Sequence, residues 1–213
     1  MEAARAQQQA VPADVKRYNL FEVVLHWLTF ASFLICLGTG LAFAYPRLFW
    51  LTNFFGGPQT SREVHPWAGI AFAVGLLLML LLWGLDELPA AGDMQWWRRL
   101  GAYVSLGDAY HENGRFNAGQ KLYFWVMLLA GVGLFASGLL LWQRDWSGAE
   151  ARSWMRLVHN VAFVGSFGFL MLHVYMSVAM YPGTLGAMLH GRVTRGWALL
   201  HHARWYRKKY GLQ

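Results

Sequence analysis

Four long apolar segments constrain the fold of this chain more than any other feature of its sequence. They run from Leu20 to Ala44, from Trp67 to Leu85, from Leu122 to Trp142 and from Leu157 to Met180. A helix needs about 20 residues to cross a hydrocarbon core about 30 Å thick, so each segment is long enough to span a membrane. Of the 213 residues, 56% are hydrophobic and 14% are charged. The sequence therefore predicts an all-α membrane protein, a bundle of four transmembrane helices.

The apolar segments divide the chain into three regions. We expect a flexible N-terminal tail over residues 1–16, a transmembrane domain over residues 17–190 and a basic C-terminal segment over residues 191–213. The first apolar segment contains His26 and is longer than the apolar region of a cleaved signal peptide, so we expect it in the mature protein. Cys36 is the only cysteine, which excludes an internal disulfide.

Lysine and arginine are distributed unequally between the two sides of the predicted membrane. Four spans place both termini on one side, which then carries thirteen of the 18 lysines and arginines, against five on the other side. Cytoplasmic loops carry the excess of positive charge, so we expect both termini in the cytoplasm. This asymmetry accounts for the net charge of +7 without a nucleic-acid partner. The basic C-terminal segment can also face anionic membrane lipid.

Two histidines of the fourth segment, His159 and His173, lie fourteen residues apart. At about 100° and 1.5 Å per helical residue, their side chains point in directions about 40° apart around the helix axis, and they differ in depth by about 21 Å. Ionisable side chains inside a membrane are rare and usually functional. The spacing therefore indicates two sites at two depths, and a haem iron at each depth is the leading interpretation.

Two more histidines lie at matching depths. His26 lies near the inner end of the first segment, and His65 lies at the outer start of the second. Depth pairs His65 with His159 near the outer face, and His26 with His173 near the inner face. Two imidazoles complete the coordination of a six-coordinate b-type haem, so we predict two haems b. Gly40 follows His26 by fourteen residues and would leave space for the outer haem, although small residues also serve simple helix packing.

The other four histidines are expected at the membrane interface and not on iron. They lie between the second and third segments or after the fourth: His111, His190, His201 and His202. Many of the twelve tryptophans also lie near the ends of the apolar segments, where aromatic rings favour the interface.

The predicted haem sites indicate electron transfer. An iron with two histidine ligands has no open position for substrate, so it can pass electrons but cannot easily bind oxygen. The sequence contains no dinucleotide fingerprint, P-loop or CxxC motif, and a membrane quinone is a suitable electron partner. Candidate quinone contacts are Asn117, Gln120 and Lys121 at the start of the third segment. Alternatively, Asn117 caps this helix and Lys121 extends to the interface.

Six short stretches, in one order along residues 17–207, resemble a known family. They are residues 22–27 (EVVLHW), 65–70 (HPWAGI), 117–121 (NAGQK), 172–176 (LHVYM), 191–193 (GRV) and 201–206 (HHARWY). These stretches are similar to the cytochrome b556 (gamma) subunit of respiratory formate dehydrogenase, in the prokaryotic di-haem cytochrome b family. The most specific of them are residues 117–121 and 201–206.

The resemblance implies a complete electron path in the bacterial inner membrane. A partner subunit with a molybdenum or tungsten pterin would oxidise formate, and an iron–sulfur subunit would pass the electrons to the outer haem. Menaquinone or ubiquinone, near His173, Asn117 and Gln120, would receive them from the inner haem. This chain would then be the quinone-reducing, electron-transfer part of a formate:quinone oxidoreductase in an anaerobic respiratory chain. Such a complex can form a higher oligomer.

Three other functions stay open on the sequence. Similar four-helix cytochromes b serve nickel–iron hydrogenases and other periplasmic oxidoreductases. A stand-alone quinone oxidoreductase or ferric reductase of the cytochrome b561 type is the second alternative. The third is a haem carrier or sensor in which the irons have no redox role.

Overall fold

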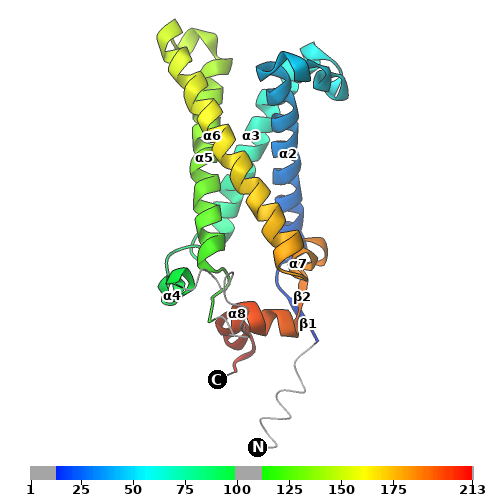
Figure 1. The fold of residues 1–213 in the computed structure, drawn as a ribbon, viewed down its shortest axis with the longest axis vertical. Helices are drawn as coiled ribbons and strands as arrows, with labels where there is room; N and C mark the ends of the chain where they lie inside the picture. The colour runs from blue at the N-terminus through cyan, green and yellow to red at the C-terminus, as the bar shows by residue number, and fades with distance from the viewer. Residues whose placement is uncertain (1–12, 99–111, 213) are drawn as a thin grey trace, which may run out of the picture. The chain divides into compact units, whose positions relative to one another are not determined.

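The computed structural model describes residues 13–98 and 112–212, and four long helices dominate it (Figure 1). They are α2 (Leu20–Ala44), α3 (Pro58–Trp83), α5 (Ala118–Trp142) and α6 (Ala149–Tyr175). All four are long and apolar enough to cross a membrane. The prediction of an all-α protein with four membrane-spanning helices is confirmed. His111 lies outside the described residues.

Three of the four long helices, α3, α5 and α6, begin before the apolar segments that predicted them. Helix α3 begins nine residues before Trp67 and ends two residues before Leu85, and α6 begins eight residues before Leu157. Helical backbone hydrogen bonds also form in water, so hydropathy marks the part of a helix that lies in the bilayer and not the ends of the helix. The end of the predicted fourth span, Met176–Met180, is a π-helical turn.

The chain forms two compact units. The helical unit consists of Val24–Leu82 and Trp125–Met171, which include most of the four long helices. The terminal unit consists of Met1–Val23, Trp83–Phe124 and Leu172–Gln213, which include the remaining helix ends and all the shorter elements that follow α6.

Glycines allow close contact between helices of the helical unit. A Cβ atom on Gly75 of α3 would lie 2.2 Å from Oγ1 of Thr29 on α2. A Cβ atom on Gly131 of α5 would lie 2.2 Å from a methyl carbon of Leu76 on α3. Both distances are too short for any side chain, so glycine sets how closely these helices pack.

Apolar side chains cover the outside of the long helices. Between 11% and 28% of the most apolar window of each span is buried within the protein. Leu81, Leu129 and Val164 are 73%, 69% and 66% exposed. Apolar surface of this extent fits contact with lipid hydrocarbon, which agrees with a protein that crosses the membrane several times.

The terminal unit joins the two ends of the chain. Strand β1 (Asp14–Lys16) pairs antiparallel with β2 (Arg192–Thr194), and the paired Val15 and Val193 are both buried. Residues 14–16 are therefore strand and not flexible tail, which corrects the predicted boundary at residue 16. The pairing partner lies at the far end of the chain, so local sequence could not reveal it. The other elements are α4 (Asp93–Arg98), α7 (Thr184–His190) and α8 (Arg195–Tyr210).

His202 differs from its predicted interfacial position. It is 1% exposed, its Nδ1 lies 2.8 Å from the Gly114 carbonyl oxygen, and its Nε2 lies 3.3 Å from a nitrogen of Arg17. The backbone of α8 is non-helical at His202, with φ −143° and ψ 50°, which turns this ring away from the regular helix surface. The prediction was wrong, since the ring of His202 is buried and in contact with Gly114 and Arg17 inside the terminal unit.

Arg17 is buried among aromatic rings next to His202. Its guanidinium is 5.0–6.0 Å from the centres of four rings and donates a hydrogen bond of 2.7 Å to the Arg115 carbonyl oxygen. The four rings belong to Tyr18, Phe116, Trp197 and Trp205. Cation–π contacts stabilise a desolvated guanidinium, so this cluster anchors the residues before α2 on α8.

Candidate metal centre

The structure brings together His65 of α3 and His159 of α6 in the helical unit. Their ring centres are 6.3 Å apart and the ring planes make an angle of 54°. Nitrogen–metal bonds are about 2.0 Å, and an imidazole nitrogen lies about 1.1 Å from its ring centre by ordinary bond lengths. Two imidazoles on opposite sides of one metal therefore have centres about 6.2 Å apart. The observed separation matches that value.

A hydroxyl group fixes the tautomer of His65. Oγ1 of Thr39 donates a hydrogen bond of 2.6 Å to the Ile35 carbonyl oxygen and lies 2.7 Å from Nδ1 of His65. With the hydroxyl proton on the Ile35 carbonyl, Nδ1 of His65 carries the hydrogen and donates to Oγ1. Nε2 then has the free lone pair that a metal requires.

The same arrangement recurs at His159. Oγ of Ser137 donates to the Gly133 carbonyl oxygen at 2.5 Å and lies 2.9 Å from Nδ1 of His159. Ser137 is 1% exposed, and Thr39 is fully buried. A hydrogen bond to the non-ligating nitrogen is the usual way in which proteins orient a metal-binding histidine.

Each of these hydroxyl residues is followed by a glycine that lies against the same histidine. A Cβ atom on Gly40 would be 3.5 Å from Cε1 of His65, and one on Gly138 would be 3.3 Å from Cε1 of His159. Gly40 thus lies beside His65, and its role in leaving space for a haem stays a prediction. Helices α2 and α5 present equivalent hydroxyl–glycine pairs to the histidines of α3 and α6. Sequence reasoning missed Thr39, Ser137 and Gly138, although a polar residue before a glycine inside two apolar spans was a usable signal.

The two predicted inner ligands belong to different units. His26 of α2 is in the helical unit, and His173 of α6 is in the terminal unit. Their pairing stays a prediction. In the terminal unit, Tyr123 of α5 stacks on His173 with ring centres 4.4 Å apart and an interplanar angle of 14°. The stacking restricts rotation of the His173 ring, and sequence reasoning did not identify this contact.

Asn117 and Gln120 form a capping box at the start of α5. Oδ1 of Asn117 accepts a hydrogen bond of 2.9 Å from the Gln120 backbone, and Oε1 of Gln120 accepts one of 3.0 Å from the Asn117 backbone. The interpretation of Asn117 as a cap is confirmed. Lys121 is 7% exposed and forms an ion pair of 2.8 Å with Asp93. Asn117, Gln120 and His173 all belong to the terminal unit.

Buried charges surround the ends of the spans in the terminal unit. The Glu22 carboxylate accepts a hydrogen bond of 2.7 Å from the Trp83 indole and forms an ion pair with Arg115. Glu87 is 3% exposed. Burial raises the pKa of Glu87 to about 8, although the charge of Lys121 acts to lower it. Glu87 is therefore largely protonated at neutral pH, and sequence reasoning did not identify it.

Residues 17–191 match the family described as prokaryotic cytochrome b561. The chain belongs to this family. The cytochrome is 31% identical over 197 residues to the formate dehydrogenase cytochrome b556(fdo) subunit of Escherichia coli K12, covering 91% of this chain and 92% of that protein. It is 31% identical over 190 residues to the formate dehydrogenase cytochrome b556 subunit of Haemophilus influenzae, covering 87% and 79%. The nitrate-inducible cytochrome b556(Fdn) subunit of E. coli K12 is 30% identical over 199 residues.

Family membership implies haem b, and the histidine pair of the cytochrome fits that cofactor. Within residues 13–98 and 112–212, no group of three or more histidine, cysteine, aspartate or glutamate side chains could hold a bare metal ion. His65 and His159 would hold a haem iron, which would supply one-electron redox chemistry at this position.

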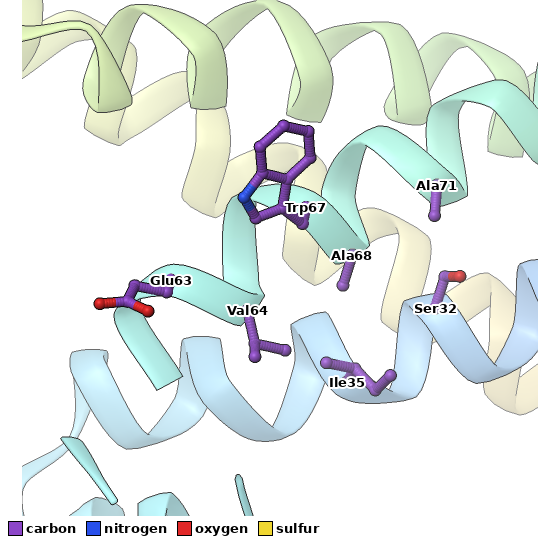
Figure 2. Close-up of a pocket in the computed structure, with 7 residues that line it drawn as sticks. All are labelled: Ser32, Ile35, Glu63, Val64, Trp67, Ala68 and Ala71. Carbon is purple, nitrogen blue, oxygen red and sulfur yellow. The ribbon is translucent and has the colours of Figure 1, made fainter. Parts of the chain in front are cut away.

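A separate groove of about 480 Å³ lies between α2 and α3 of the cytochrome (Figure 2). Trp67 and Glu63 of α3 lie at its edge, and small side chains of both helices form much of the remaining lining: Ser32, Ala68 and Ala71. The lining contains none of the four predicted haem ligands. The groove therefore has no part in the metal centre.

Proposed function

We propose that this chain is the membrane-anchoring cytochrome b subunit of a formate dehydrogenase complex, which carries electrons from an iron–sulfur subunit through two bis-histidine haems to a membrane quinone. The observation that carries this proposal is the His65–His159 pair, at a separation that suits one haem iron and with a buried hydroxyl group beside Nδ1 of each ring. The names of relatives that align with 87–91% of the chain support formate as the electron source.

His65 and His159 would hold the outer haem through their Nε2 atoms. With both imidazoles used as ligands, a haem held there would supply one-electron transfer and not substrate binding. Thr39 and Ser137 orient the two rings, and the adjacent glycines leave space beside them. The buried hydroxyls exclude water from the Nδ1 side of each histidine.

His26 and His173 would hold the inner haem. This part of the proposal depends on the sequence, in which the two histidines lie at one depth near the cytoplasmic ends of the first and fourth spans. The stacked Tyr123 supports it, since a restrained His173 ring loses less entropy when it binds a metal.

Menaquinone or ubiquinone would bind near Asn117, Gln120 and His173. The capping box uses the two side-chain amide oxygens and leaves the side-chain N–H groups for other acceptors. A quinone carbonyl is such an acceptor. Quinone would thus be reduced on this chain, while formate would be oxidised on a partner that carries a molybdenum or tungsten pterin.

The complex would lie in the bacterial inner membrane with both termini of this chain in the cytoplasm. The excess of lysine and arginine on the side of the termini supports this orientation. The iron–sulfur subunit would then contact the outer side, next to the His65–His159 site.

Purification of the chain with its native partners in mild detergent tests this function. Formate added without other reductants should reduce two haems b per chain in an optical spectrum, and an added quinone should reoxidise them. Reduction by hydrogen but not by formate would favour a hydrogenase partner. Reduction by quinol alone, with no protein partner, would favour a stand-alone quinone oxidoreductase.

A further inference from the structure

The terminal unit contains a second cavity, of about 270 Å³, beside the start of α2. Its wall includes residues before α2 and residues where α7 meets β2, among them Lys16, Asn19, Leu20, Leu189, His190 and Arg192. The lining of the cavity contains none of the residues assigned above to haem or quinone. Neither cofactor therefore explains this cavity.

Two like charges face each other at this cavity. Lys16 of β1 and Arg192 of β2 are directly opposite in the antiparallel pair, and both are exposed. Like charges in this position destabilise a strand pair. Lys209 adds a third cation, since its ammonium group donates a hydrogen bond to the Lys16 carbonyl oxygen. Asp14, on the same face of β1, is opposite Thr194.

Carboxylates do not neutralise the facing pair. Among the residues that the structure describes, neither Lys16 nor Arg192 forms an ion pair. Glu22, the nearest acid along α2, is held instead by the Asn19 backbone, the Trp83 indole and Arg115. An external anion would therefore remove the repulsion between the two cations.

Backbone hydrogen bonds join the two segments that form the cavity wall. The Gly191 carbonyl oxygen accepts hydrogen bonds from the backbone nitrogens of Arg17 and Tyr18, at 2.8 and 3.1 Å. Gly191 has φ +70°, and a Cβ atom there would lie 2.6 Å from the Tyr18 carbonyl oxygen. Only glycine suits this position, so the cavity is a preformed feature of the fold.

Two exposed leucines also line the cavity. Leu20 is the first residue of the first span and is 78% exposed, and Leu189 is 53% exposed. Cations next to exposed leucines at the start of a span match the two parts of a phospholipid, an anionic head group and an acyl chain. A free phosphate ion would use the cations but leave the leucines in water.

We propose that this cavity binds an anionic phospholipid, with Lys16 and Arg192 on the phosphate and an acyl chain along Leu20 and Leu189. A basic residue at an anionic lipid surface typically contributes about fivefold in affinity, so two together contribute about 30-fold. The site is independent of the formate dehydrogenase assignment.

Native mass spectrometry of the purified protein with added phosphatidylglycerol or phosphatidylcholine tests the site. The wild type should bind phosphatidylglycerol the more tightly, and Lys16→Gln with Arg192→Gln should reduce this affinity about 30-fold. The matched control, Arg62→Gln with Lys208→Gln, removes the same charge from two exposed positions and should have no effect. The haem spectrum reports whether each variant is folded.

Two outcomes would overturn the proposal. Equal affinity of the wild type and the Lys16, Arg192 variant for phosphatidylglycerol would show that the cations do not bind lipid phosphate. Displacement of the lipid by millimolar inorganic phosphate, together with unchanged lipid binding by Leu189→Asn, would show a site for free anions. If the double variant does not fold, Arg192→Gln alone should reduce affinity about fivefold, and Arg192→Lys should restore most of it.

Discussion

Thr39→Val removes the hydroxyl that accepts the hydrogen bond from Nδ1 of His65. Valine has nearly the same volume as threonine, so the change is chemical and not steric. Thr39 is fully buried, and water therefore has no access to replace the lost acceptor. The substitution leaves the Nδ1–H group of His65 buried without its 2.7 Å partner.

The size of the effect follows from this loss. A buried donor without an acceptor costs about 1–3 kcal/mol, and loss of such an outer hydrogen bond typically lowers metal affinity about 10–100-fold. An imidazole that no longer donates through Nδ1 is also a weaker electron donor to iron, which disfavours the oxidised form. If about 1.4 kcal/mol of the loss falls on the oxidised form, the midpoint potential of one haem rises by about 60 mV.

An optical redox titration of the purified cytochrome measures this shift. We expect one of the two b-haem transitions to rise by tens of millivolts in Thr39→Val and to return in Thr39→Ser. Thr29→Val is the matched control, because Thr29 is also buried on α2 but donates only to the Leu25 carbonyl oxygen. The reasoning is refuted if Thr39→Val leaves both potentials unchanged at full haem content, or if Thr29→Val produces the same shift.

Three further predictions concern neighbouring features of the structure. Gly138→Val should lower the haem content to about one per chain, because a Cβ atom there is only 3.3 Å from the His159 ring. Gly165→Val is the control, since a Cβ atom at that position meets nothing within 4 Å, and it should keep both haems. A pyridine haemochrome assay measures both. Tyr123→Leu should change the low-temperature electron paramagnetic resonance spectrum of one haem, and Tyr123→Phe, which keeps the stacked ring, should not. Identical spectra for the wild type and both variants would contradict the role of the stack. Glu87 binds a proton in the folded state with a pKa of about 8, against an ordinary 4.5, so its contribution to stability is complete below pH 4.5 and lost as pH rises through about 8. The free energy of unfolding should fall over this window by at most about 1.4 kcal/mol per pH unit. The thermal midpoint should fall with it, and Glu87→Gln should flatten the fall.

The spans could be predicted from the sequence because lipid contact requires long apolar segments. Apolar length located α2, α3, α5 and α6, but it missed the polar first turns of α3 and α6, which form helix outside the bilayer. Depth along the spans also selected His65 and His159 as partners, and the structure brings their rings together.

Other parts of the site depend on contacts that local sequence does not contain. Thr39 and Ser137 each precede a glycine inside an apolar span, but only the packing of neighbouring helices shows that each contacts a histidine. The β1–β2 pair and the contact between Arg17 and His202 join the two ends of the chain. Residues separated by about 180 positions cannot be paired from local pattern alone.

The number of haems b per chain, measured by pyridine haemochrome in the wild type, His65→Ala and His26→Ala, tests the central claim most directly. The account predicts two haems in the wild type and one in each variant, and the haem that remains should have a different midpoint potential in the two variants. A wild type without haem, or loss of the same haem from both variants, would contradict the assignment of these histidines to two separate irons.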